Sequence, residues 1–175
     1  MVMPAAEIRE RVVAYVKHNA AKDPQAIRDV VQKGHDRLAA LLDGMTEEQA
    51  RWKPDADTWS VLEVLRHVVA SKRGTARLCA MLARGDARDG AATLGDRGPE
   101  LSSLAQARAE LEQSHRALLD FVATISPETD LEATFDHPWF GPHNCREWAA
   151  FQRVHDGDHS GQIERIKAAP GLPSP

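Results

Sequence analysis

Apolar side chains recur three and four residues apart through most of the chain, whereas strict alternation of apolar and polar residues is nearly absent. The first spacing is the period of one face of an α-helix, and alternation is typical of a half-buried β-strand. The pattern therefore predicts an all-α protein. It predicts five helices, at about residues 5–20, 23–44, 60–83, 102–126 and 144–168.

Residues that favour helix ends stand at the expected boundaries. Asp23, Ser60 and Asn144 are good N-cap residues, because a short polar side chain accepts a hydrogen bond from a free N–H of the first turn. Glu63 follows Ser60 by three residues, which is the spacing of a capping box. Pro127 ends the fourth helix, because proline cannot continue it.

The segments between these helices differ in character. Residues 45–59 allow one short turn, whereas residues 84–100 are rich in glycine and charge and are predicted to be a mobile connector. The loop at residues 126–143 runs into DHPWFGPHN (residues 136–144), a composition that favours an ordered loop packed on the body of the protein. Residues 169–175 are expected to be a disordered tail. Four long helices fit an antiparallel four-helix bundle over residues 23–168, and residues 1–22 form an additional N-terminal helix.

Length and composition narrow the class of protein. The 175 residues and 42% hydrophobic content suit one domain, residues 1–175, with one packed core. A net charge of −4, spread without long like-charge runs, argues against a nucleic-acid partner. No apolar run approaches the roughly 20 residues needed to span a bilayer, so no membrane association is expected. Two cysteines and an N-terminus without an apolar signal core indicate the cytoplasm.

The stretch HDGDHSGQI holds the first candidate chemistry. His155 and His159 are four residues apart, so on a helix they lie about 40° apart and roughly 6 Å along the axis, close enough to bind one ion. Trp148, Gln152 and Ile163 share their stripe, which turns both imidazoles toward the core. The alternative is a pair of structural histidines, hydrogen-bonded to buried carbonyls or acids.

A third imidazole strengthens the metal hypothesis. His67 shares a largely apolar flank with Val64, and in an antiparallel bundle it can face the other two histidines if their helices are neighbours. Three neutral imidazoles suit Zn²⁺, Ni²⁺ or Fe²⁺, and three protein ligands leave a coordination position open for water or substrate.

The same stretches carry a family resemblance. WSVLEVLRHV, preceded by the approach KPDADTWS, and HDGDHSGQI together resemble the DinB-like superfamily over about residues 25–168. The resemblance implies a four-helix bundle that binds one divalent metal through His67, His155 and His159. Its members include S-transferases and isomerases that use low-molecular-weight thiols such as mycothiol or bacillithiol. The N-terminal helix, and Asp158 where many members have another histidine, depart from the family pattern.

Several neighbours of the histidines have two possible roles. Gln162 can orient an imidazole or a metal-bound water, or make an ordinary interhelical hydrogen bond. Glu63 can accept the second N–H of His67 or act as a general base, besides capping its helix. Asp156 and Asp158 are expected to be solvated. Gly157 and Gly161 would allow the close approach of a neighbouring helix, or leave room for a substrate above the metal.

The remaining histidines and cysteines are given structural roles. His137 and His143 flank PWFGP and fit a loop role, while His18, His35 and His115 fit surface or interhelical positions. Cys79 fits a small core residue. Cys145 lies in the first turn of the last helix, where the helix N-terminus would lower the pKa of its thiol.

These patterns support two classes of function. The first is a metal-dependent enzyme, similar to a thiol S-transferase, that activates a low-molecular-weight thiol cosubstrate or a water molecule toward a small-molecule substrate. Water as the nucleophile would make it a hydrolase instead. The second is a non-enzymatic metal-binding bundle, acting as a sensor or interaction protein. The apolar content and the extra helix favour a homodimer in either case.

Overall fold

The computed structural model describes residues 3–86, 98 and 100–174. Five long helices lie where the sequence predicts them, with ends that differ by a few residues. The predicted mobile connector at 84–100 falls mostly outside the described residues. The helices are α1 (Ala6–Ala20), α2 (Pro24–Ala40), α3 (Glu47–Arg51), α4 (Val61–Leu82), α5 (Leu104–Ala123) and α6 (Cys145–Lys167), and the strands are β1 (Phe135–His137) and β2 (Gly141–His143).

The predicted N-caps are formed. The Ser60 hydroxyl accepts a hydrogen bond from the Glu63 N–H, and the Glu63 carboxylate accepts one from the Ser60 N–H at 2.8 Å. Asn144 caps α6 in the same reciprocal way with Glu147. These boxes fix where α4 and α6 begin, and so they set the positions of all side chains along the two helices.

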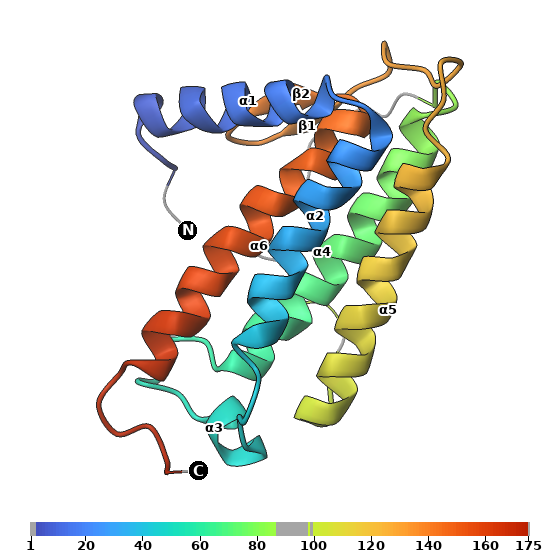
Figure 1. Cartoon of the computed structure of the whole chain (residues 1–175). Coiled ribbons are helices and arrows are strands. Elements are labelled where there is room, and N and C mark those ends of the chain that lie inside the picture. Colours follow the sequence, from blue (N-terminus) through green and yellow to red (C-terminus); the bar gives the residue numbers. More distant parts are fainter. Residues whose placement is uncertain (1–2, 87–97, 99, 175) are drawn as a thin grey trace.

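Helices α2, α4, α5 and α6 pack side by side as a four-helix bundle, which confirms the predicted fold (Figure 1). Helices α2 and α6 run one way and α4 and α5 run the other. Each helix therefore has one parallel and one antiparallel neighbour: α4 is antiparallel to α6, and α2 is antiparallel to α5. The end of α4 and the start of α5 lie at opposite ends of the bundle, although α5 is the next long helix along the chain.

Helix α1 lies across the end of the bundle where α6 begins (Figure 1). Val16, Asn19 and Ala20 in its last turns are buried, whereas Ile8 and Tyr15 remain exposed. The additional N-terminal helix predicted from the sequence is therefore present, and its C-terminal half packs against the bundle.

A short antiparallel hairpin precedes α6, where the sequence predicts an ordered loop. Phe135 pairs with His143 and His137 with Gly141. Gly141 has a φ of 77°, a left-handed conformation that glycine adopts without strain. The Trp148 indole donates a hydrogen bond to the Phe135 carbonyl at 3.1 Å, which fastens the hairpin to α6. The predicted packing of this loop is confirmed, and the hairpin is the one departure from all-α structure in the described residues.

The bundle core has two apolar clusters with a polar layer between them. Val31, Cys79, Leu118 and Ala149 belong to the cluster near α1, and Leu38, Leu65, Leu111 and Ile163 belong to the cluster near α3. Every bundle helix contributes to the layer between. Its buried side chains are His35, Lys72, Ser114, His115, Gln152, Asp156 and Ser160.

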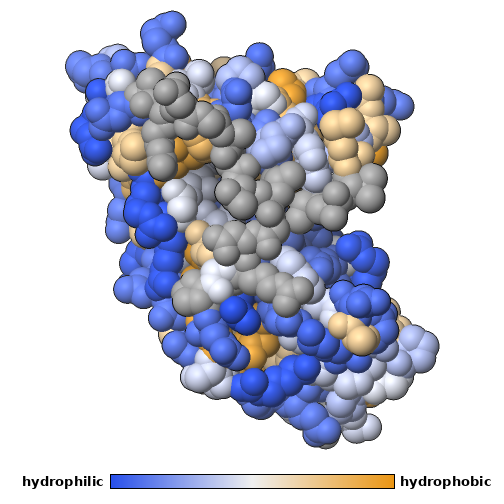
Figure 2. All heavy atoms as spheres, turned by 180° about the vertical axis from the view of Figure 1, so that it is seen from behind, coloured by the Kyte–Doolittle hydropathy of each residue, from blue (hydrophilic) through white to orange (hydrophobic). Residues whose placement is uncertain are grey.

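The outer surface of the bundle is mainly polar. On the face seen in Figure 2, hydrophilic side chains predominate among the described residues, and hydrophobic ones show in small separate areas. None of the helices in the described part of the chain has the length and apolar content of a bilayer span. The tail, expected to be disordered, instead contacts α3, because the Gln49 side chain donates a hydrogen bond to the Pro173 carbonyl at 2.8 Å.

Candidate metal centre

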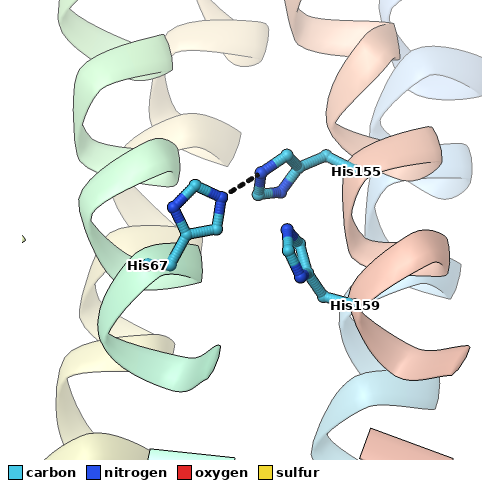
Figure 3. A group of neighbouring side chains, drawn as sticks. All are labelled: His67, His155 and His159. Carbon is cyan, nitrogen blue, oxygen red and sulfur yellow. Dashed lines mark hydrogen bonds between the residues drawn. The ribbon is translucent and has the colours of Figure 1, made fainter. Parts of the chain in front are cut away.

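The structure brings His67, His155 and His159 together between α4 and α6 (Figure 3). The ring centroid of His67 lies 5.0 Å from that of His155 and 4.7 Å from that of His159. The centroids of the two α6 rings, His155 and His159, are 4.5 Å apart. One nitrogen from each ring lies within 4.8 Å of the others. The three rings thus converge on one small volume, as the spacing of four on α6 and the antiparallel packing of α4 require. We call these residues the histidine triad.

The spacing of the nitrogens fits a first-row divalent ion. Two nitrogens bound to one ion at roughly 2.0–2.1 Å lie about 2.8–3.0 Å apart in octahedral geometry and about 3.3–3.4 Å apart in tetrahedral geometry. The Nε2 atoms of His67 and His155 are 3.1 Å apart. The rings also meet at angles of 39°, 62° and 64°, so their planes are not parallel and their lone pairs can point at a common centre. The three histidines could therefore hold a metal ion together.

Gln162 contacts one imidazole of the triad directly. The Nδ1 atom of His159 lies 2.9 Å from the Gln162 Oε1, an oxygen that accepts a hydrogen bond. This contact favours the tautomer of His159 that carries its proton on Nδ1, which leaves the Nε2 lone pair that a metal needs. Glu63 has the capping role, and its carboxylate also forms an ion pair with Lys53 at 2.8 Å.

Comparison with known proteins places this fold in a family. The family model of the DinB superfamily matches residues 31–163, which include the whole histidine triad. The chain belongs to the DinB superfamily. The crystal structure of TT2238, a four-helix bundle protein, is similar to this DinB superfamily member with a TM-score of 0.62 and 24% sequence identity, over 83% of this chain and 98% of that one. No curated protein sequence matches.

A buried ion pair lies next to the triad in this DinB superfamily protein. The Lys72 ammonium and the Asp156 carboxylate are 2.5 Å apart, and both side chains are 0% exposed. The expected solvation of Asp156 is therefore wrong, whereas Asp158 is exposed as expected. Helix α2 packs closely against the ion pair at Gly34, because a Cβ there would meet the Asp156 Cβ at 3.4 Å.

The sequence contained a signal for this pair. Lys72 follows Val69 by three residues and precedes Ala76 by four, so it lies in the middle of the buried stripe of α4. Asp156 likewise follows Gln152 by four residues on α6, and the Gln152 amide donates a hydrogen bond to the Asp156 carboxylate at 2.8 Å. Two opposite charges on buried stripes of neighbouring helices predict an ion pair, since an unpaired charge there would be very costly.

Burial changes the acid–base properties of the triad. Loss of solvation holds the pKa of His155 well below its ordinary value of 6.5, and the nearby His159 and His67 rings add to the effect. Loss of solvation and the His67 ring also lower the pKa of His159, although its hydrogen bond to Gln162 opposes them. Both rings are therefore neutral near pH 7, which is the state in which imidazole binds a metal.

The hairpin histidines have the expected loop role and a buried environment. His137 packs its ring on Phe140 and Phe151, with centroids 4.7 and 4.8 Å apart, and His143 packs on Trp148. Loss of solvation, with a smaller effect of His143, lowers the pKa of His137 to about 4. Among the described residues these two histidines do not join the group that could hold a metal.

The two cysteines are poor nucleophiles in this setting. Burial raises the pKa of the Cys145 thiol, so the predicted lowering by the helix N-terminus is wrong. Burial raises the pKa of Cys79 further, which fits its predicted place in the core. Desolvation of the thiolate outweighs the helix terminus at Cys145 because the side chain is fully buried.

Within the described part of the chain, the glycines of α6 do not mark contact with another helix. A Cβ at Gly157 would meet the guanidinium of Arg153 at 2.9 Å, and one at Gly161 would meet that of Arg165 at 3.5 Å. Both neighbours are flexible ends of side chains from α6 itself. The expected close approach of a neighbouring helix occurs instead at Gly34, where α2 meets α6.

Proposed function

We propose that the protein is a metal-dependent enzyme in which His67, His155 and His159 hold one divalent ion, Zn²⁺, Ni²⁺ or Fe²⁺, and a thiol or a water molecule takes the remaining position. The observation that carries this proposal is the convergence of three imidazole nitrogens within 4.8 Å of one another, from two helices far apart in the sequence. Membership of the DinB superfamily supports it, because such proteins are often metal-dependent.

The residues around the triad favour an anionic ligand. Imidazole ligands bring no charge to the ion, and the buried Asp156 carboxylate beside them is already paired with Lys72. When bound, the divalent ion would supply a Lewis acid that lowers the pKa of a thiol or of water to near neutrality. Gln162 holds His159 with its Nε2 lone pair free.

The nucleophile of the proposed transfer is the thiolate of a small cosubstrate. Its sulfur forms a bond to the electrophilic carbon of the second substrate as the leaving group departs with its electron pair. The thiol proton goes to solvent or to the leaving group. The raised pKa values of Cys79 and Cys145 argue against a thiolate from the protein itself.

Metal analysis tests the site. The parent protein, loaded with Zn²⁺ and dialysed, should retain about one equivalent, and His67→Ala, His155→Ala and His159→Ala should each lose at least roughly 100-fold in affinity, because three ligands fall to two. His115→Phe is the matched control, since His115 is an equally buried histidine on α5. Full zinc occupancy in the three alanine variants, with the helical circular-dichroism signal unchanged, would refute the site.

Turnover tests the reaction. Zinc- or nickel-loaded protein should consume a low-molecular-weight thiol in the presence of a generic electrophile, and His155→Ala and chelator-treated protein should not. Metal-dependent hydrolysis of small esters or amides without thiol consumption would instead identify water as the nucleophile. Metal-dependent stability without turnover of either kind would favour a binding or sensing role.

A further inference from the structure

A continuous row of hydrogen bonds joins the buried ion pair to the triad. Lys72 donates to the Oδ2 of Asp156, and the amide nitrogen of Gln152 donates to the Oδ1 of the same carboxylate at 2.8 Å. That amide nitrogen also lies 3.2 Å from the Nδ1 of His155. The Nε2 of His155 in turn lies 3.1 Å from the Nε2 of His67.

The ion pair determines which way the Gln152 amide points. A carboxylate that pairs with an ammonium at 2.5 Å is ionised and only accepts hydrogen bonds. The NH₂ group of Gln152 must therefore face Asp156, because a carbonyl oxygen there would oppose a negative charge in a buried place. Gln152 is 1% exposed, so water does not offer its amide another partner. The second N–H of the same NH₂ group is left to face His155.

This orientation selects one tautomer of His155. An N–H that points at Nδ1 requires a lone pair there, so the proton of the neutral ring lies on Nε2. That Nε2–H can donate to the Nε2 of His67, which accounts for the 3.1 Å contact between the two rings. His159, one turn further along α6, has the opposite arrangement: an oxygen, that of Gln162, faces its Nδ1.

We propose that the Lys72–Asp156 pair, acting through the Gln152 amide, holds metal-free His155 as its Nε2–H tautomer and thereby weakens the binding of a divalent ion by the triad. The proposal rests on the proposed metal site and adds a positioning residue, Gln152, to it. Binding through the Nε2 of His155 requires the proton to move to Nδ1. The Gln152 amide must then turn away, and its hydrogen bond to Asp156 is lost or weakened. Gln152 and Gln162 thus act on neighbouring histidines in opposite senses.

The tautomers can be measured without any metal. In ¹⁵N-labelled, chelator-treated protein at pH 7, long-range ¹H–¹⁵N correlation spectra should show His155 protonated on Nε2 and His159 protonated on Nδ1. Spectra of His155→Ala and His159→Ala assign the signals. A proton on the Nδ1 of His155 in the parent protein would overturn the proposal, and this measurement does not depend on whether the triad binds a metal in the cell.

Matched substitutions test the effect on affinity. Gln152→Met removes the N–H that faces His155, and Zn²⁺ should bind roughly threefold to tenfold more tightly in competition with a chelating dye, the effect of one neutral hydrogen bond. Gln162→Met removes the oxygen that faces His159, and Zn²⁺ should bind roughly tenfold to 100-fold more weakly.

The two proposals fail in different ways. Equal or weaker zinc binding by Gln152→Met than by the parent would overturn the role of Gln152 while leaving the metal site intact. Unchanged zinc binding by His67→Ala would overturn the metal site itself. Gln152→Met should also shift His155 toward the Nδ1–H form in the spectra, a signature that a general loss of stability would not produce.

Discussion

Two groups of buried histidines lie on opposite sides of the bundle, and only one of them is arranged to hold an ion. The triad lies between α4 and α6, whereas His35 and His115 lie between α2 and α5. The rings of His35 and His115 are closer together than any two rings of the triad, with centroids 3.9 Å apart. Proximity of imidazoles in a core is therefore a poor sign of a metal site.

The direction of the ring nitrogens separates the two groups. His35 and His115 stack with an angle of 2° between their planes, so their lone pairs run side by side and cannot meet on one ion. Each Nε2 already has a partner: the Glu112 carboxylate for His35 at 2.8 Å, and the Gln32 carbonyl oxygen for His115 at 3.0 Å. Both Nδ1 atoms are buried without a hydrogen-bond partner among the described residues. This stacked pair packs two helices together.

The Lys72–Asp156 pair lies between the two groups and affects both. Desolvation lowers the pKa of His115 to about 3, and the Lys72 charge is the next cause. Lys72 also contributes to the low pKa of His155, after desolvation and the neighbouring rings. One buried ammonium thus helps to keep histidines on both sides of the bundle neutral.

Removal of Asp156 should have the largest effect on stability. Asp156→Leu leaves the Lys72 ammonium buried without its partner, and we expect a loss of about 3–5 kcal/mol in the free energy of unfolding. Urea denaturation of metal-free protein measures it. The exposed Asp158, two residues along α6, provides the control: Asp158→Leu should change the free energy by less than about 0.5 kcal/mol.

The double variant Lys72→Met, Asp156→Leu sharpens the comparison. Replacing both charges with apolar side chains should restore most of the lost stability, because the pair stabilises the fold little beyond the cost of burying it. The triad and the stacked pair should keep their geometry in this variant, because the ion pair affects their charge state and not their packing. A double variant as unstable as Asp156→Leu would show that the ion pair itself holds the bundle together.

The sequence predicted the bundle, and the inward direction of His155 and His159, from helical periodicity. The approach of His67 required α4 and α6 to be neighbours, which the family resemblance implied. His155 and His159 share a stripe with Gln152 and Ile163, and that stripe must face the core whatever its neighbours are. Their role as metal ligands stays a prediction. The packing partners of the other polar residues depend on which helices are neighbours and in which direction each runs, and periodicity does not determine this.

The stacked pair shows the limit of that reasoning. His35 and His115 are 80 positions apart in the sequence and meet only because α2 and α5 are antiparallel neighbours. Neither lies in a motif, so nothing in the sequence distinguishes them from ordinary interhelical histidines. The same holds for Gln152, whose importance comes from the direction of one amide rather than from its position on the stripe.

Acid should destabilise the stacked pair through His115. The pKa of His115 in the folded protein is about 3, below the ordinary value of 6.5. Below pH 6.5 His115 therefore binds a proton in the unfolded chain but not in the folded protein. The contribution of His115 to the free energy of unfolding is therefore fully present above pH 6.5, and it falls by up to about 1.4 kcal/mol per pH unit toward pH 3. His115→Phe should remove this share of the slope between pH 6.5 and 4.5, measured by urea denaturation with chelator present.

A surface histidine provides the control for the acid experiment. His18 on α1 is exposed, and His18→Gln should leave the slope of stability against pH unchanged. If the free energy of unfolding of His115→Phe depends on pH as steeply as that of the parent, the proton uptake must come from other groups. His115 would then not account for the acid sensitivity of the fold.

The smallest expected effect is the energy of the stack itself. Parallel imidazoles at 3.9 Å gain dispersion and packing that neither ring makes alone, and a double-mutant cycle with His35→Ala and His115→Ala should give a coupling of about 0.5–1.5 kcal/mol at pH 7. Zinc affinity should be the same in all four proteins, because these rings do not reach the triad. A coupling near zero would mean that the rings are held together by Glu112 and Gln32 rather than by each other. A change in zinc affinity would mean that the polar layer couples the two groups of histidines. The Lys72–Asp156 pair would then transmit changes at the stacked pair to the triad instead of separating the two groups.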